Sequence, residues 1–228
     1  MNNGALIVFE GLDGCGKTTQ LEYAKRWLKD KGYKVFHTEW HASVEVKKAL
    51  TKGGARRRML SPITANLVHA MDFADRYTWQ ILPRLRRGYV VLADRYIYTA
   101  LARGVVRGCK QSWLQAVYEF ACAPLTTFYF RVEPEVSLER ILRDRVSMKF
   151  FESGMDLNFS SDVEESFLQF QGKVMEQYDE LSDVYSFVTI DGSQDQKEIQ
   201  AQVKNTLQSL LVRGKLPEPK KKKKAKVT

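Results

Sequence analysis

Few residues in the sequence could support disulfide or metal chemistry. The 228 residues include three cysteines, and no pair of them has the C-x-x-C spacing that is typical of redox and metal sites. The three histidines form no ligand pattern with them either. We therefore expect a protein of a reducing compartment, the cytoplasm, without a disulfide framework.

Long apolar runs are also missing. No segment approaches the roughly 18 consecutive apolar residues that identify a membrane-spanning helix. Hydrophobic residues still make up 44% of the chain, which is enough for a well-buried core at this length. The sequence predicts a globular protein with no membrane partner.

Acidic residues are scarce at one end of the chain. The formal net charge is +9, but residues 213–228 hold eight Lys or Arg and one Glu, so +7 belongs to them and +2 to residues 1–212. With little apolar surface to bury, residues 213–228 are predicted to be a disordered Lys-rich tail after one folded domain, 1–212. A solubilising role, nuclear import and binding to a nucleic acid remain alternatives for the tail.

Five apolar runs have the length of β-strands and alternate with helical segments. Their nearly continuous apolar composition is typical of strands that are covered on both faces. The runs are ALIVFE (5–10), YKVFHTE (33–39), YVVLADR (89–95), TTFYFRV (126–132) and YSFVTIDG (185–192). The alternation predicts an α/β fold, a doubly wound sheet with helices on both faces.

Six segments have helical patterns. They span residues 17–31, 61–87, 112–121, 134–145, 162–181 and 196–212. Ser61 and Pro62 form a favourable helix start, and Pro83 is predicted to kink or restart the same helix. Residues 146–162 have no sustained period, and a connection of this length is usually functional or mobile.

The stretch FEGLDGCGKTTQ follows the first apolar run. It matches the pattern G-x-x-x-x-G-K-[ST] between a strand and a helix, where backbone N–H groups and the helix N-terminus can surround an anion. The sequence therefore predicts a site for ATP, in which Lys17 reaches the β- and γ-phosphates and the Thr18 hydroxyl holds Mg²⁺. The ATP-binding residues expected in this loop are Gly11, Leu12, Asp13, Gly14, Cys15, Gly16, Lys17, Thr18 and Thr19.

A second polar cluster, Asp94-Arg95-Tyr96, ends the third apolar run. Open α/β proteins bind ligands at the carboxyl ends of their strands. There, the carboxylate of Asp94 can hold the Mg²⁺ shell, and the guanidinium of Arg95 can bind a second phosphate through two hydrogen bonds. Together with the phosphate loop, this pair predicts a site that holds a second phosphate group beside that of ATP.

These motifs resemble the thymidylate kinase family of P-loop nucleoside monophosphate kinases over nearly all of residues 5–212. The resemblance rests on FEGLDGCGKTTQ, the helical ADR that ends in Arg76, DRYIYTA and VEPEVSLER. It implies a three-layer fold with a parallel sheet of order 2-3-1-4-5, a homodimer, and transfer of the ATP γ-phosphoryl group to a deoxynucleoside monophosphate, with dTMP the leading acceptor. By the same resemblance, Asp13 approaches the acceptor sugar, Arg76 the base and Arg95 the phosphate.

Residues 143–161 resemble the lid of this family. Members that have glycine at the position of Gly14 use lid arginines as the catalytic cation, and the sequence does not decide which of the nearby arginines acts. The catalytic residues expected from motif and resemblance are Lys17, Arg95, Arg143 and Arg145, and Arg140 is expected to bind ATP.

The acceptor-binding half departs from the family pattern. Four positions before the base-facing arginine, members usually have an aromatic residue, whereas this chain has Asp72. Asp72 can pair with Arg76 at i,i+4 or face the acceptor base, and Trp40 is either a core residue or a wall of the acceptor pocket. The acceptor-binding residues expected are Asp13, Trp40, Asp72, Phe73, Arg76, Arg95, Thr99 and Arg103.

Two other functions remain open from the sequence. A chain with this phosphate loop could be a catalytically silent or regulatory ATP-binding protein. It could also be a polynucleotide 5′-kinase that recruits nucleic acid through residues 213–228.

Overall fold

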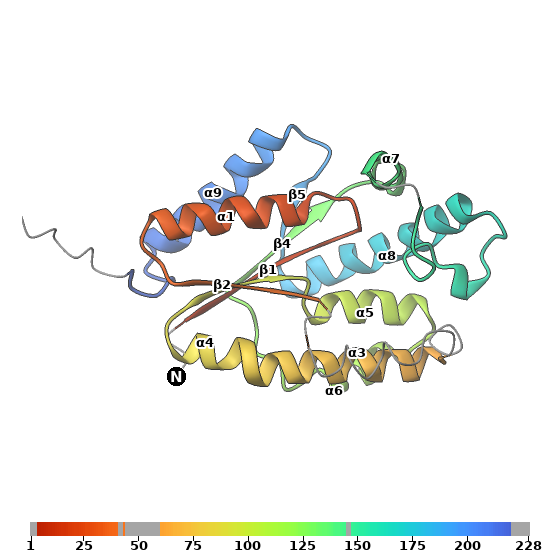
Figure 1. The fold of residues 1–228 in the computed structure, drawn as a ribbon, viewed down its shortest axis with the longest axis horizontal. Helices are drawn as coiled ribbons and strands as arrows, with labels where there is room; N and C mark the ends of the chain where they lie inside the picture. The colour runs from red at the N-terminus through yellow and green to blue at the C-terminus, as the bar shows by residue number, and fades with distance from the viewer. Residues whose placement is uncertain (1–3, 41–42, 44–59, 145–146, 220–228) are drawn as a thin grey trace, which may run out of the picture.

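A computed structural model describes residues 4–40, 43, 60–144 and 147–219, and all five predicted strands are present. They are β1 (Ala5–Gly11), β2 (Val35–Glu39), β3 (Val90–Asp94), β4 (Thr126–Arg131) and β5 (Val188–Asp191). They form one parallel sheet in the order β2-β3-β1-β4-β5 (Figure 1). The predicted α/β fold and its sheet order are confirmed.

The middle of the sheet is the core of the protein. Every residue of β1 is buried, because β3 and β4 flank it and helices cover both faces. The ring centroid of Phe9 lies 5.3 Å from that of Phe128 and 6.0 Å from that of Phe130. Close aromatic packing of this kind gives the loops at the strand ends a rigid support.

The helices form a layer on each side of the sheet. Figure 1 shows α1 and α9 side by side on one face, with α3, α5 and α8 on the other. Their bounds are α1 (Lys17–Asp30), α3 (Pro62–Arg76), α5 (Ile97–Val106), α8 (Val163–Tyr185) and α9 (Gln196–Val212). The other α-helices of the described residues are α4 (Leu82–Arg86), α6 (Gln111–Val117) and α7 (Pro134–Asp144), with a 3₁₀ turn at Met155–Leu157.

The helix predicted over residues 61–87 is interrupted once. Ser61 caps its start, as predicted. Ahead of Pro83 the chain forms a π-helical turn, Tyr77–Ile81, which separates α3 from α4. Pro83 has no N–H to donate to the preceding turn, and the Arg84 guanidinium donates to the carbonyls of Gln80 and Trp79 in that turn at 2.8 and 3.5 Å.

The sequence patterns do not predict α5. This helix starts two residues after β3, and most of its residues are buried. Its sequence, IYTALARGVV, contains four β-branched residues and a glycine, which have low helix propensity, and this explains the omission. Two helix ends also differ from the prediction, since α6 ends at Val117 and α8 extends to Tyr185.

Part of the predicted tail packs against the domain. The backbone N–H of Lys215 donates to the carbonyl of Leu210 at 3.0 Å, and the side chain of Leu216 is buried in the core cluster. The prediction of disorder from residue 213 misses this contact, because one leucine is a weak signal beside a lysine run. Residues 220–228 lie outside the described residues.

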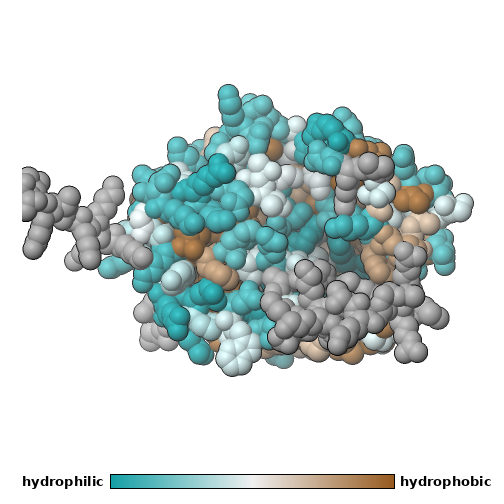
Figure 2. All heavy atoms as spheres, viewed as in Figure 1, coloured by the Kyte–Doolittle hydropathy of each residue, from teal (hydrophilic) through white to brown (hydrophobic). Residues whose placement is uncertain are grey.

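The face seen in Figure 2 is mostly hydrophilic, with separate hydrophobic areas. Within the described parts of the chain, no helix combines the length and the apolar composition needed to cross a membrane. Among the exposed apolar residues, Ile63, Leu67 and Met71 form a row with a spacing of four on α3. Residues with this spacing lie on one side of a helix, so the row is a continuous apolar strip.

Candidate active site

The loop between β1 and α1 has the shape of an anion-binding cradle. Gly14 and Gly16 have φ angles of 77° and 86°, a left-handed conformation that glycine adopts without strain. A Cβ on Gly14 would lie 2.9 Å from the carbonyl oxygen of Ser137, so a larger residue would collide with α7. The first N–H groups of a helix have no partner within it, and those of α1 open onto this loop.

Two side chains at the start of α1, Lys17 and Thr18, make defined contacts across the loop region. The Nζ atom of Lys17 donates to the carbonyl of Leu12 at 3.1 Å, which holds the ammonium group across the loop. The hydroxyl of Thr18 donates to a carboxylate oxygen of Asp94 at 2.6 Å. Hydroxyl and carboxylate oxygens are the ligand types that Mg²⁺ prefers, so this pair fits the predicted metal.

A Mg²⁺ ion held by this pair would take its other ligands from the substrate or from water. Within residues 4–40, 43, 60–144 and 147–219, no three side chains of His, Cys, Asp or Glu come together as a metal centre. Mg²⁺ is typically held by one or two protein oxygens together with substrate phosphates and water. The Thr18–Asp94 pair is of this kind.

Cys15 fills the space beneath the loop. Its side chain is buried, and its Sγ atom would lie 2.8 Å from a Cβ placed on Gly11. Burial raises the pKa of the Cys15 thiol above its ordinary value, and the charge of Lys17 opposes this only in part. The thiol therefore packs the loop and is not activated by it.

Asp13 joins the phosphate loop to α5. One of its carboxylate oxygens accepts a hydrogen bond of 2.6 Å from Arg95, and the other accepts one from Arg103. Burial alone would raise the pKa of the Asp13 carboxyl, but the charges of Arg103, Arg95 and Lys17 outweigh it and hold the pKa well below its usual range. Both oxygens of the residue expected near the acceptor sugar are therefore already engaged by arginines.

Arg95 is held from several sides. Its φ of 70° is uncommon for a residue with a side chain. Its Nη1 atom donates to the carbonyl of Gly11 at 2.9 Å and to the hydroxyls of Thr99 and Tyr178 at 3.2 and 3.4 Å. The carboxylate of Glu10 lies behind both hydroxyls. Burial raises the pKa of the Glu10 carboxyl, against the opposing charge of Arg95.

A cavity of about 530 Å³ opens beside this cluster, a volume within the range of small-ligand pockets. The charged residues of its lining are Asp13, Arg95, Arg103, Arg107, Lys149, Glu152 and Asp156. The lining also includes Trp40, Asn66, His69, Thr99, Phe150 and Phe151. The structure thus brings together five of the expected acceptor residues, Asp13, Trp40, Arg95, Thr99 and Arg103.

The other three expected acceptor residues, Asp72, Phe73 and Arg76, are buried and are not among the described residues that line this cavity. The Nε atom of Arg76 donates to one oxygen of Asp72 at 3.0 Å. The backbone N–H of Ser43 donates to the other oxygen at 3.1 Å. Of the two interpretations of Asp72, the structure therefore has the ion pair with Arg76.

The described residues between α7 and α8, 147–162, form a segment after α7 that is anchored at the end of α5 and to α8. Arg107 donates to the two carboxylate oxygens of Asp156 at 2.7 and 3.1 Å, and to the carbonyl of Phe151 at 2.8 Å. Gln171 of α8 donates to the carbonyl of Glu152 at 2.7 Å. This segment therefore forms one wall of the cavity. The sequence patterns do not single out Arg107, because it directly follows the helix that they miss.

Two of the arginines expected to act from the lid, Arg140 and Arg143, lie away from this cavity. Arg140 donates to the carbonyl of Gly192 at 2.9 Å. The side chain of Arg143 is 71% exposed, and its Nε atom is 3.7 Å from Asp144. Neither arginine lines the 530 Å³ cavity, and Arg145 lies outside the described residues.

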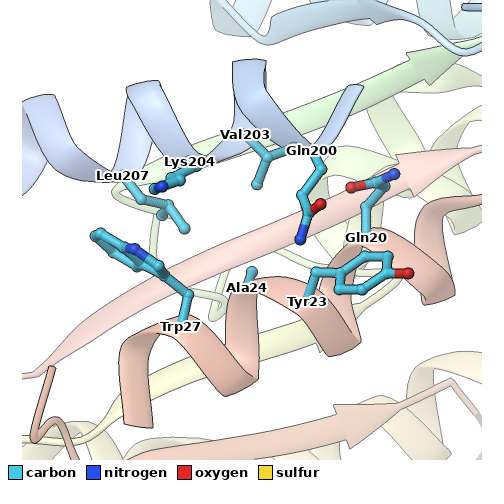
Figure 3. Close-up of a pocket in the computed structure, with 8 residues that line it drawn as sticks. All are labelled: Gln20, Tyr23, Ala24, Trp27, Gln200, Val203, Lys204 and Leu207. Carbon is cyan, nitrogen blue, oxygen red and sulfur yellow. The ribbon is translucent and has the colours of Figure 1, made fainter. Parts of the chain in front are cut away.

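A much smaller cavity, about 30 Å³, lies between α1 and α9. In Figure 3, side chains from both helices face one another across it. They are Gln20, Tyr23, Ala24, Trp27, Gln200, Val203, Lys204 and Leu207. A space of this size holds roughly one or two water molecules, so it is a gap in helix packing rather than a ligand site.

The sheet is parallel and of this order, a phosphate loop follows its central strand, and arginines surround a cavity at the same edge. This is the architecture of P-loop kinases, and the protein is of that class. A family model described as thymidylate kinase matches residues 9–203. The chain belongs to the thymidylate kinase family, whose members are phosphotransferases.

Similar proteins support this assignment over the whole domain. The chain is 42% identical over 205 residues to the probable thymidylate kinase 2 of Saccharolobus solfataricus, a match that covers 90% of this chain and 95% of the relative. It is 32% identical over 207 residues to the probable thymidylate kinase of Archaeoglobus fulgidus, with coverages of 90% and 96%. It is 30% identical over 202 residues to the thymidylate kinase of Halalkalibacterium halodurans, with coverages of 85% and 91%. The resemblance expected from the motifs is confirmed.

The ion pairs of Asp13 predict how stability depends on pH. At pH 7, Asp13→Asn should lower the free energy of unfolding by roughly 3 kcal/mol, because two arginines lose their shared anion. Since the pKa of Asp13 is depressed in the folded state, the wild type loses this stabilisation as the pH falls below about 4, the carboxyl pKa of the unfolded chain. Urea unfolding at pH 7 and pH 3 should therefore show that the difference in unfolding free energy between the wild type and Asp13→Asn is smaller at pH 3.

The exposed Asp30, at the end of α1, is the matched control. Asp30→Asn should change the free energy of unfolding little at either pH. If Asp13→Asn lowers the free energy of unfolding equally at pH 7 and at pH 3, the carboxylate does not stabilise the fold through its charge.

Proposed function

We propose that the protein phosphorylates dTMP to dTDP, with ATP as the donor and Mg²⁺ as the metal. Family membership supports ATP-dependent phosphorylation of a nucleoside monophosphate, and relatives named as thymidylate kinases support dTMP as the acceptor. The observation that carries the proposal is that Asp13, in the phosphate loop, also holds Arg95 and Arg103 at the 530 Å³ cavity. The donor and acceptor sites therefore share a residue.

On the donor side, the loop N–H groups and the ammonium group of Lys17 bind the β- and γ-phosphates. Thr18 and Asp94 would hold Mg²⁺, which when bound offsets the charge on the phosphate oxygens. Arg140, fixed beside Gly192, is proposed to contact ATP at the side of the loop. These residues orient the terminal phosphoryl group toward the cavity.

On the acceptor side, no general base is required. The second pKa of a phosphate monoester is about 6, so at pH 7 its oxygens are already competent nucleophiles. Arg95 and Arg103 are proposed to bind this phosphate, and their positive charge offsets the repulsion between two polyanions. The protein therefore acts by binding and orientation.

The base of the acceptor is proposed to lie toward Trp40, Asn66 and His69, away from the arginines. Both oxygens of Asp72 are engaged by Arg76 and Ser43. No carboxylate from this position then faces the base, which favours thymine over a base with more hydrogen-bond donors. Phe150 and Phe151 would help to exclude water from the transferring group.

We also propose that the protein works in a reducing compartment, the cytoplasm. The three cysteines support this, because none of them forms a disulfide: Cys15, Cys109 and Cys122.

The homodimer that the family resemblance implies is also a proposal. The apolar strip of Ile63, Leu67 and Met71, which are 56%, 48% and 50% exposed, supports it.

We expect sedimentation velocity to give twice the 26.3 kDa monomer mass, and Leu67→Asp to give the monomer. A wild-type monomer at micromolar concentration would contradict the dimer.

An acceptor screen tests the proposed reaction. ADP release should depend on dTMP and should be slower with the other common monophosphates and with a 5′-hydroxyl oligonucleotide. Removal of residues 220–228 should leave dTMP turnover unchanged, and this truncation keeps the buried Leu216. No acceptor-dependent ADP would favour a silent ATP-binding protein. Oligonucleotide turnover that the truncation abolishes would favour a polynucleotide 5′-kinase.

The lid arginines predict a loss of turnover. Replacement of Arg140, Arg143 and Arg145 by alanine together should lower kcat by about 10³ or more, by analogy with arginine fingers, and the single variants should identify the residue responsible. The exposed Arg26 on α1 provides a matched control, and Arg26→Ala should leave kcat unchanged. If kcat of the triple variant stays within about tenfold of the wild type, these arginines are not the catalytic cation.

A further inference from the structure

Glu10 is a fully buried charged residue at the end of β1, and it is not among the described residues that line the cavity. Its carboxylate accepts three hydrogen bonds. One oxygen accepts from the backbone N–H of Tyr96 at 2.8 Å, and the other accepts from the hydroxyls of Thr99 and Tyr178 at 2.7 and 2.8 Å. A buried charge persists when donors of this kind satisfy it.

The first of these bonds holds a strained backbone. Arg95 has a φ of 70°, a conformation that persists in a residue with a side chain only when its surroundings impose it. The N–H of Arg95 donates to the carbonyl of Phe9 at 3.0 Å, and the next N–H, that of Tyr96, donates to Glu10. Consecutive groups of β1 therefore hold both sides of the strained residue.

The other two bonds set the direction of the hydroxyls around Arg95. A hydroxyl has one hydrogen to donate. The hydroxyls of Thr99 and Tyr178 also lie 2.9 Å from each other, and both face the Nη1 atom of Arg95, at 3.2 and 3.4 Å. Because the Glu10 carboxylate only accepts, the hydrogens of this pair run toward it, and the hydroxyl oxygens stay acceptors for the guanidinium.

We propose that Glu10 and Tyr178 are positioning residues that hold Arg95 in the orientation that binds the acceptor phosphate. The inference rests on the proposed function of Arg95 and deepens it. Tyr178 belongs to α8, the helix that also holds the segment after α7 through Gln171. The same helix therefore supports the acceptor-binding arginine and one wall of the acceptor cavity.

The test is a pair of near-isosteric variants, Tyr178→Phe and Glu10→Gln, compared with a matched control. Tyr129 is equally buried, its ring stacks on that of Tyr178 at 5.3 Å, and its hydroxyl donates to Asp179 at 3.0 Å, not to the Glu10 network. Tyr129→Phe therefore removes a similar hydroxyl without touching Arg95.

Steady-state kinetics with ATP and dTMP should separate positioning from general destabilisation. We expect both test variants to raise the KM for dTMP about tenfold and to leave the KM for ATP within about twofold, because the donor loop keeps its contacts. Tyr129→Phe should change neither KM. If Glu10→Gln does not fold, Tyr178→Phe carries the test alone.

A double variant tests whether the effect passes through Arg95. In an Arg95→Lys background, Tyr178→Phe should raise the KM for dTMP much less than it does in the wild type, because coupled residues are not additive. Equal effects in both backgrounds, equal changes in the two KM values, or an unchanged KM for dTMP in Tyr178→Phe would overturn the inference. If the wild type turns over no monophosphate at all, the proposed function fails and the inference fails with it.

Discussion

The carboxylate of Asp13 is the interaction on which the rest of the site depends. It lies between Arg95 and Arg103 and close enough to Lys17 for their charges to depress its pKa. Without this anion, three cations would face one another at the edge of the sheet, and their repulsion would be strong in a partly buried setting. The adjacency of β1 and β3 makes the contact possible, because it brings the loop after β1 beside the residue that follows Asp94.

The helix α5 organises the cavity beside this cluster in the same way. Arg103 lies on the last turn of α5 and Arg107 directly follows it, and each pairs with an aspartate from another part of the chain, Asp13 and Asp156. One pair ties α5 to the phosphate loop and the other ties it to the segment after α7. Charge balance between distant segments therefore builds the cavity, and it leaves guanidinium groups at the surface where an anionic substrate would bind.

Much of the fold follows from local patterns, and the omissions have physical causes. The strands are recognisable because each is a short apolar run between helical segments, and the phosphate loop because its glycines, lysine and threonine are close in sequence. The helix α5 is missed because its four β-branched residues and its glycine have low helix propensity. Glu10 is overlooked because a single acidic residue after an apolar run has no pattern, although a charge at the end of a buried strand is itself a signal.

The sequence by itself determined the parallel α/β architecture, the phosphate loop and the Asp94-Arg95 pair, because backbone geometry over a few residues dictates each of them. Only the tertiary structure decided which residues line the cavity beside Arg95, that Asp72 pairs with Arg76, and that Glu10 meets Tyr178, a residue 168 positions away. Such contacts arise where strand order and helix packing bring distant segments together. A pattern of near neighbours carries no information about them.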